Sequence, residues 1–248
     1  MSKHHKLIAF LIGLAFVIVL QSLAHPEPVF RFLVPAYLLY MAGVYFYNRW
    51  YLQQLQALNL WVLIRSELLL AAGFGLYLII PSEGVRGLFL LTGVGVIAFF
   101  ELMIGKHSEN IVLNETLFVA AGLFFALSAF SQYIPSYQTA YTALVFFGTA
   151  LLARSFYDFM PQPSETKTIG ALVLGLFASE IFWALSFLPL HFSALGIILF
   201  DFFYFALMMN YYFLFHSLNF KKMQFHLFLI MASGLLVIAA TPWKILGQ

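Results

Sequence analysis

The segment 168–215 reads TIGALVLGLFASEIFWALSFLPLHFSALGIILFDFFYFALMMNYYFLF. It contains two apolar runs, 168–188 and 193–215, joined by the four residues PLHF. Each run is long enough for a helix that crosses the hydrocarbon core of a bilayer, which needs about 20 residues. The segment therefore predicts a tight hairpin of two antiparallel transmembrane helices.

The composition of the whole chain supports the same class of protein. Twelve Lys and Arg and ten Asp and Glu make 9 % of the 248 residues charged, against about 25 % in soluble domains. Hydrophobic residues make up 63 %. The chain has too few polar residues to cover the surface of a soluble protein, and we therefore expect lipid to be its main solvent. The predicted fold class is an all-α, polytopic transmembrane helix bundle.

Nine runs are long and apolar enough to span a bilayer. They are 7–23, 29–46, 60–80, 87–104, 116–133, 137–153, 168–188, 193–215 and 225–240. The remaining residues are too few for a soluble domain, so residues 1–248 are predicted to form a single transmembrane domain. The start of the chain also resembles a cleavable signal peptide, because Ser22-Leu23-Ala24 follows a basic end and an apolar run. Cleavage there leaves eight spans.

The distribution of Lys and Arg predicts the orientation, because cytoplasmic flanks collect cations. With a cytoplasmic N-terminus, nine cations lie on the cytoplasmic side and three on the outer side. The nine are Lys3, Lys6, Arg49, Arg65, Lys106, Arg154, Lys167, Lys221 and Lys222, and the three are Arg31, Arg86 and Lys244. We expect the C-terminus outside, and the protein in the cytoplasmic membrane of a prokaryote.

Two connections between the spans are informative. Residues 48–59 alternate apolar and polar side chains, which is typical of a helix lying in the membrane interface, or of an extension of the third span. Pro161-Gln162-Pro163 blocks a helix before Ser164, so we expect Ser164 to cap the seventh span or a short turn leading to it.

Several functional classes are excluded by residues that the sequence lacks. The chain has no cysteine, which excludes disulfides, thiolate metal sites and cysteine nucleophiles. It contains no HExxH, GxSxG, Walker A or GxGxxG motif. The net charge of +2 is too small for a nucleic-acid surface. We therefore expect no cofactor, no metal site and no nucleic-acid partner. The expected partners are the lipid bilayer, a small solute, proton or cation, and a second membrane protein.

Five charged residues lie inside the predicted spans: Arg65, Glu67, Glu101, Glu180 and Asp201. A charge inside hydrocarbon costs at least about 2.5–3.5 kcal/mol, so such residues face the bundle interior and have partners. Glu101 lies three residues from the inner end of its span, where its side chain can instead reach the interface. These residues are the candidates for a functional site.

Glu180 and Asp201 are the foremost candidates. Each lies eight residues from the outer end of its span, at a depth of about 12 Å. The tight turn between the two spans lets the carboxyls face each other. Two carboxyls in a low dielectric share a proton, hold a cation or pair with Arg or Lys. This arrangement suits proton or cation binding.

Arg65 is the natural counter-ion of these carboxyls. It does not pair with Glu67, because residues two apart point to different faces of a helix. Its expected partners are Glu101, Glu180 or Asn210. A polar ladder through the membrane is therefore predicted, made of Arg65, Asn210, Glu67, Asp201 and Glu180.

Three functions remain open on this evidence. The first is a small proton- or cation-coupled transporter that uses the buried carboxylates. The second is a non-enzymatic accessory or assembly subunit of a membrane complex, in which the buried charges only specify helix packing. The third is an enzyme acting on a lipid or isoprenoid, with Glu180 as acid or base and a lateral opening beside Asp201.

Overall fold

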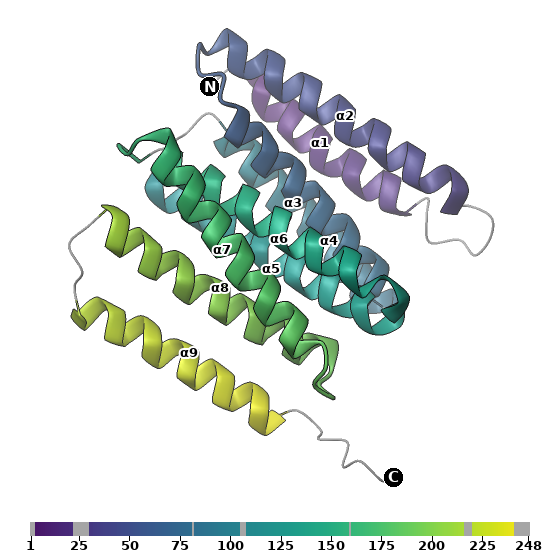
Figure 1. Ribbon diagram of the computed structural model, residues 1–248. Coiled ribbons are helices and arrows are strands. Elements are labelled where there is room, and N and C mark those ends of the chain that lie inside the picture. The colour runs from purple at the N-terminus through teal and green to yellow at the C-terminus, as the bar shows by residue number, and fades with distance from the viewer. Residues whose placement is uncertain are drawn as a thin grey trace. The chain divides into compact units, whose positions relative to one another are not determined.

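The computed structural model describes residues 3–21, 30–80, 82–104, 108–158, 160–215 and 220–240. These residues are almost entirely helical and contain no strand (Figure 1), so the all-α prediction is confirmed. The helices are α1 (Lys3–Gln21), α2 (Phe30–Gln54), α3 (Leu60–Ile79), α4 (Glu83–Met103), α5 (Glu109–Tyr133), the 3₁₀ helix η1 (Pro135–Tyr137), α6 (Gln138–Tyr157), α7 (Ser164–Leu185), α8 (Phe192–Phe215) and α9 (Phe220–Ala240).

The helices have the length and composition of transmembrane segments. Among the described residues, 7 helices are long and apolar enough to cross a bilayer, and Met223–Val237 is a shorter apolar stretch within α9. Large apolar side chains such as Leu39 and Leu91 are more than 70 % exposed, which is stable only against lipid. The chain is an integral membrane protein. The number of spans, their orientation and the cleavage of the first one, whose candidate site lies outside the described residues, stay predictions.

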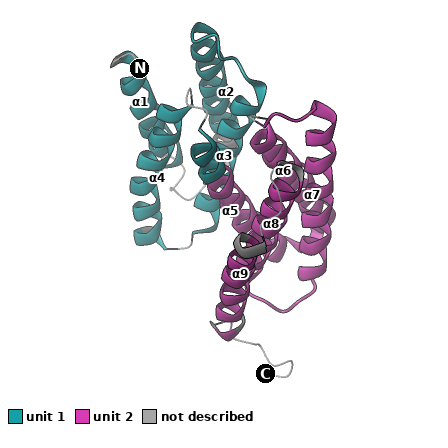
Figure 2. Ribbon diagram, turned by 90° about the vertical axis from the view of Figure 1, so that its left-hand side faces the viewer, with its two compact units in different colours: residues 1–115 teal, residues 116–248 magenta. Residues whose placement is uncertain are grey.

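The chain divides into two compact units (Figure 2). Unit 1 comprises Met1–Glu115 and unit 2 comprises Thr116–Gln248, so the boundary falls inside α5. Each unit is described by itself below. The prediction of a single transmembrane domain is not tested by this division.

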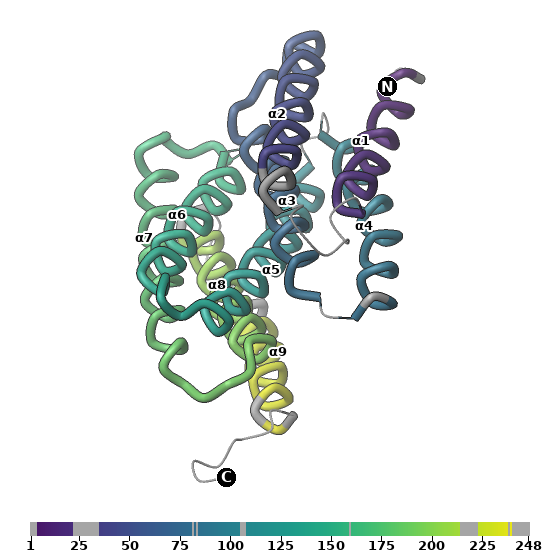
Figure 3. Tube along the Cα trace, turned by 90° about the vertical axis from the view of Figure 1, so that its right-hand side faces the viewer, coloured from purple at the N-terminus to yellow at the C-terminus, as the bar shows by residue number. Residues whose placement is uncertain are grey.

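In unit 1, α1 packs along α4, and α3 contacts both α2 and α4. Figure 3 shows α1 beside α4. The approach is close at Gly13, where a Cβ atom would lie 2.8 Å from the Val94 carbonyl oxygen. Phe16 and Tyr37 are fully buried beside this contact and form the centre of the unit's apolar core.

In unit 2, the tightest packing is between α6 and α7, and α8 packs between α7 and α9. A Cβ atom at Gly175 would lie 2.7 Å from the Phe146 carbonyl oxygen. The small residue thus allows the two helix backbones to approach. Leu152 and Phe156 are fully buried on the α6 side.

The connections correct one prediction and refine another. Residues 48–54 continue α2, which ends at Gln54, and Gln56 just beyond it has a φ of 52°. Neither an interface helix nor an extension of the third span is present there, so that prediction is wrong. Asn59 caps α3 instead, because its Oδ1 accepts a hydrogen bond from the Trp61 backbone N–H at 2.8 Å. Helix α7 begins at Ser164, directly after the helix-blocking prolines, as predicted. Its N-cap residue is Pro163, so the prediction that Ser164 caps the helix is wrong.

Candidate functional site

A buried carboxyl group lies in the interior of unit 1, in the last turn of α4. Glu101 of α4 is 1 % exposed. Its Oε1 accepts hydrogen bonds from the Ser66 hydroxyl of α3 at 2.8 Å and from the Asn48 amide of α2 at 3.3 Å. The Asn48 amide also donates to Ser66 at 3.2 Å. The expectation that Glu101 reaches the interface is therefore wrong, because three helices enclose it.

Arg65 forms an ion pair with Glu115, through a hydrogen bond from its Nε to the Glu115 Oε2. Both side chains are buried. The prediction that Arg65 pairs with Glu101, Glu180 or Asn210 is wrong. The sequence does not mark Glu115 as a candidate, because the predicted fifth span starts at Thr116, whereas α5 begins at Glu109 and carries Glu115 inside the helix.

Glu67 is half-buried on another face of α3, and it does not pair with Arg65, as predicted. It lies within electrostatic range of Glu101. The nearby Tyr37 and Tyr40 hydroxyls donate to backbone carbonyls, at 2.5 Å and 2.9 Å respectively. The Oε1 of Glu67 is buried without a hydrogen-bond partner. We refer to Asn48, Ser66, Glu67 and Glu101 as the carboxyl cluster.

The charges in this interior do not balance. Arg65 is the one buried guanidinium or ammonium group among the described residues of unit 1, and Glu115 already pairs with it. Glu67 and Glu101 each keep one buried oxygen without a hydrogen-bond partner. Two neighbouring carboxylates without a cation are strongly disfavoured in a low dielectric. The cluster therefore suits a bound proton or a small cation.

His5 brings a fourth helix, α1, into contact with this cluster. Its side chain is 2 % exposed, although the sequence places it on the cytoplasmic flank. Its Nδ1 lies 2.9 Å from the Tyr47 hydroxyl, its ring stacks on Tyr51 with centroids 3.7 Å apart, and it hydrogen-bonds to the Glu101 backbone. No sequence pattern marks this contact, because it joins residues far apart in the chain.

The other sequence candidates lie in unit 2. Glu180 is exposed on α7, whereas Asp201 is half-buried on α8 with Ser233 of α9 as its hydrogen-bond neighbour. Asn210 donates to the Gly170 carbonyl at 3.2 Å. The structure thus gives Asp201 and Asn210 separate partners, and the Glu180 side chain is exposed. That Glu180 and Asp201 act together, and that a polar ladder exists, stay predictions.

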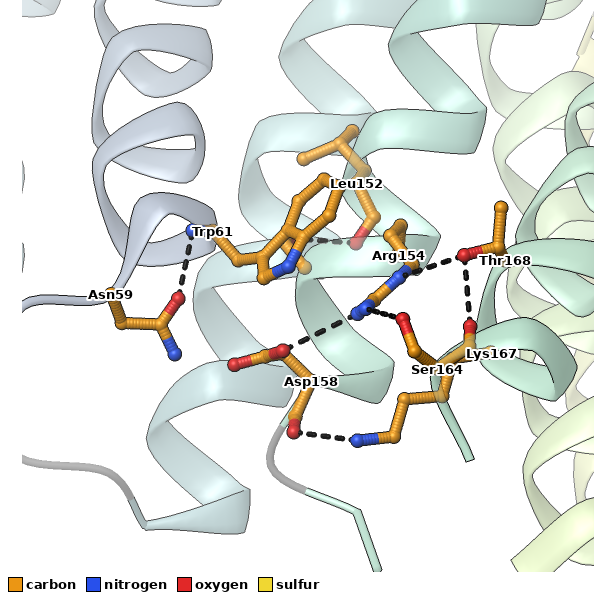
Figure 4. Close-up of polar contacts among 9 residues, drawn as sticks. Asn59, Trp61, Leu152, Arg154, Asp158, Ser164, Lys167 and Thr168 are labelled. Atoms are coloured by element: carbon orange, nitrogen blue, oxygen red, sulfur yellow. Dashed lines mark hydrogen bonds and ion pairs between the residues drawn. The ribbon is translucent and has the colours of Figure 1, made fainter. Parts of the chain in front are cut away.

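A second polar group lies where α6 meets α7 (Figure 4). Arg154 donates to Asp158, Ser164 and Thr168 at 3.2–3.3 Å. Lys167 donates to the Asp158 carbonyl at 2.9 Å. Arg154 and Lys167 are each 8 % exposed. These bonds join the end of α6 to the first turn of α7, which is a structural role.

Unit 2 also has an apolar groove of about 370 Å³ between α7 and α8. Its walls include Phe177, Phe205 and Met209, with Asn210 as the polar residue. Asp201 does not line this groove. This groove is therefore not the lateral opening beside Asp201 that a lipid enzyme requires.

Comparison of the chain with protein-family models, with curated protein sequences and with solved structures gives no match.

Proposed function

We propose that this integral membrane protein is a small transporter coupled to a proton or cation, and that its carboxyl cluster binds the coupling ion. The observation that carries the proposal is the charge imbalance around Glu101. Glu67 and Glu101 lie within electrostatic range of each other, and Arg65 is committed to Glu115. A site that must hold a proton or cation, and that can release it, is what coupled transport requires.

The hydrogen bonds around Glu101 support a loading site rather than a permanently neutral acid. Ser66 and Asn48 donate to the same carboxyl oxygen, Oε1, which stabilises negative charge there. The other oxygen, Oε2, has no hydrogen-bond partner. A proton or cation on Oε2 completes the site, and its loss leaves a carboxylate that two donors still hold.

The proposal moves the centre of the site from Glu180 and Asp201 to Glu67 and Glu101. Glu67 belongs to the site already predicted from the sequence. Glu101 is a weaker candidate in the sequence, because its position near the end of the span allows exposure. Asp201 remains a half-buried acid with one unpaired oxygen. The cytoplasmic membrane of a prokaryote, with a cytoplasmic N-terminus, remains the proposed location.

Charge movement after a pH jump tests the proposal without knowledge of the solute. The purified protein is reconstituted into liposomes on a solid-supported membrane, and transient currents are recorded. We expect a current in the wild type that is lost in Glu101→Gln, because Gln keeps an acceptor for Ser66 and Asn48 but binds no proton. The matched control is Glu165→Gln, at an exposed acid in the first turn of α7.

Three outcomes are decisive. A jump in Na⁺ or K⁺ at constant pH that produces the same current assigns the site to that cation. A wild-type current equal to that of protein-free liposomes contradicts the proposal. So does an unchanged current in Glu101→Gln.

The second candidate is the accessory or assembly subunit, and one observation favours it. Arg65 is directly paired with Glu115 in the interior, as expected where buried charges specify helix packing. On this alternative, Arg65→Met destabilises the protein strongly, and no pH-jump current arises in the wild type. Because loss of the Arg65–Glu115 pair destabilises the fold under either function, the wild-type pH-jump current is the measurement that separates the two.

A further inference from the structure

A second set of polar side chains follows the contact between α8 and α9 in unit 2. Asp201 and Tyr204 are three residues apart on α8 and therefore share a face of that helix. His226 and Ser233 are seven residues apart on α9 and also share a face. We call these four residues the α8–α9 seam. Figure 1 shows the two helices side by side, and they are in contact.

One end of the seam is a hydrogen bond between two titratable groups. The Tyr204 hydroxyl lies 2.7 Å from the His226 Nδ1, and the two rings meet edge to face. The Tyr212 ring also lies against His226, with centroids 6.0 Å apart, and Phe225 lies beside it. Tyr204 and Tyr212 are thus the titratable groups that α8 presents to His226.

The other end of the seam is Asp201. Ser233 is its hydrogen-bond neighbour, and its Oδ2 is buried without a partner. Seven residues of α9 separate the levels of His226 and Ser233, a rise of about 10 Å along the helix. The seam thus leads from the predicted cytoplasmic end of α9 to an acid inside the predicted eighth span.

We propose that the α8–α9 seam is a proton relay that loads Asp201 from the side of His226. An incoming proton binds the His226 Nε2, and the proton on Nδ1 passes to the Tyr204 oxygen. The hydroxyl proton of Tyr204 leaves, through one bridging water, for the Asp201 Oδ2. One proton enters and one arrives, and Tyr204 is regenerated. His226 returns to its starting tautomer by proton exchange with water, which supplies a proton to Nδ1 and takes one from Nε2.

The relay differs from the carboxyl cluster of unit 1 and does not depend on it. Its chemistry matches the composition of the seam, because imidazole and phenol are groups that both accept and donate a proton. Ion pairs or cations are not needed for it. An aspartate that lies alone within a membrane span is stable when it is protonated and hydrogen-bonded, which is the loaded state of the relay.

The test measures how fast Asp201 takes up a proton. Protons are released by a light flash into a suspension of the full-length protein in lipid nanodiscs, and the infrared carbonyl band of protonated carboxyls is followed. Asp201→Asn identifies the part of the band that belongs to Asp201. Tyr204→Phe then removes one hydroxyl from the seam. Tyr212→Phe is the matched control, because Tyr212 lies against the same ring, whereas Tyr204 is the tyrosine hydrogen-bonded to it.

We expect proton uptake by Asp201 to slow by about tenfold or more in Tyr204→Phe and to keep its wild-type rate in Tyr212→Phe. His226→Gln breaks the relay on its other side and slows uptake in the same way, which keeps the proposal testable if one variant fails to fold. Equal rates in the wild type and Tyr204→Phe overturn the relay. Equal slowing in both tyrosine variants also overturns it, as does a band that Asp201→Asn leaves unchanged.

Discussion

The ion pair between Arg65 and Glu115 makes a quantitative prediction about stability. Both side chains are less than 10 % exposed, so Arg65→Met leaves the Glu115 carboxylate in the interior without its counter-ion. Removing one partner of a buried pair costs about 3–5 kcal/mol. For a chain of this size, 1 kcal/mol corresponds to about 2–4 °C in Tm, so we expect a fall of about 6–20 °C.

A double-mutant cycle separates the pair from the packing of its side chains. The variants are Arg65→Met, Glu115→Met and the double variant, and Arg49→Met, at an exposed site on α2, is the matched control. We expect the double variant to be more stable than either single variant, because no uncompensated charge remains. Arg49→Met should keep the wild-type Tm.

Thermal unfolding in detergent is followed by tryptophan fluorescence, because the chain has four tryptophans and no cysteine for a thiol-reactive dye. A single Arg65 variant with a Tm within the error of the wild type refutes the reasoning. Additive losses in the double variant refute it as well, since they show that the two side chains act independently.

Two further predictions concern unit 2. Gly175→Ala should lower the free energy of unfolding by about 1–3 kcal/mol, because the new Cβ would lie 2.7 Å from the Phe146 carbonyl oxygen. The control Gly95→Ala, on α4, has open space around the new Cβ and should be neutral or stabilising. Chemical denaturation measures both variants, and equal effects contradict the packing argument. Arg154→Leu should lower Tm well below that of Arg49→Leu, because it removes two hydrogen bonds from α6 to α7 and the ion pair with Asp158 at the end of α6. A thermal scan by circular dichroism measures this, and equal melting temperatures contradict it.

The sequence predicts the fold class because the hydrophobic content leaves little choice of solvent. It also predicts where α7 starts, because the ring of Pro163 cannot continue a helix and Ser164 follows it. The end of α2 and the start of α5 are missed. In both places polar residues such as Asn48 and Glu115 resemble loop residues in the sequence, although they lie in helices and are buried against other helices of unit 1.

The candidate site is only partly readable from the sequence. Glu67 stands out because it lies within an apolar run. Glu101 stands out less, because its position near a helix end allows exposure, and only the meeting of α2, α3 and α4 encloses it. Glu180 shows the opposite case. Its helix is apolar on every side, so periodicity does not indicate which face is buried, and the structure places Glu180 on the exposed one.

The protonation of Glu101 is the property that decides whether the carboxyl cluster binds the coupling ion. Infrared difference spectra between acidic and alkaline buffer, recorded with and without Na⁺, should contain a band of a protonated carboxyl that is lost in Glu101→Gln and retained in Glu165→Gln. The band should persist at neutral pH, where exposed carboxyls are ionised, or disappear when Na⁺ replaces the proton. A spectrum that Glu101→Gln leaves unchanged at every pH and Na⁺ concentration contradicts the proposal that this cluster binds a proton or cation.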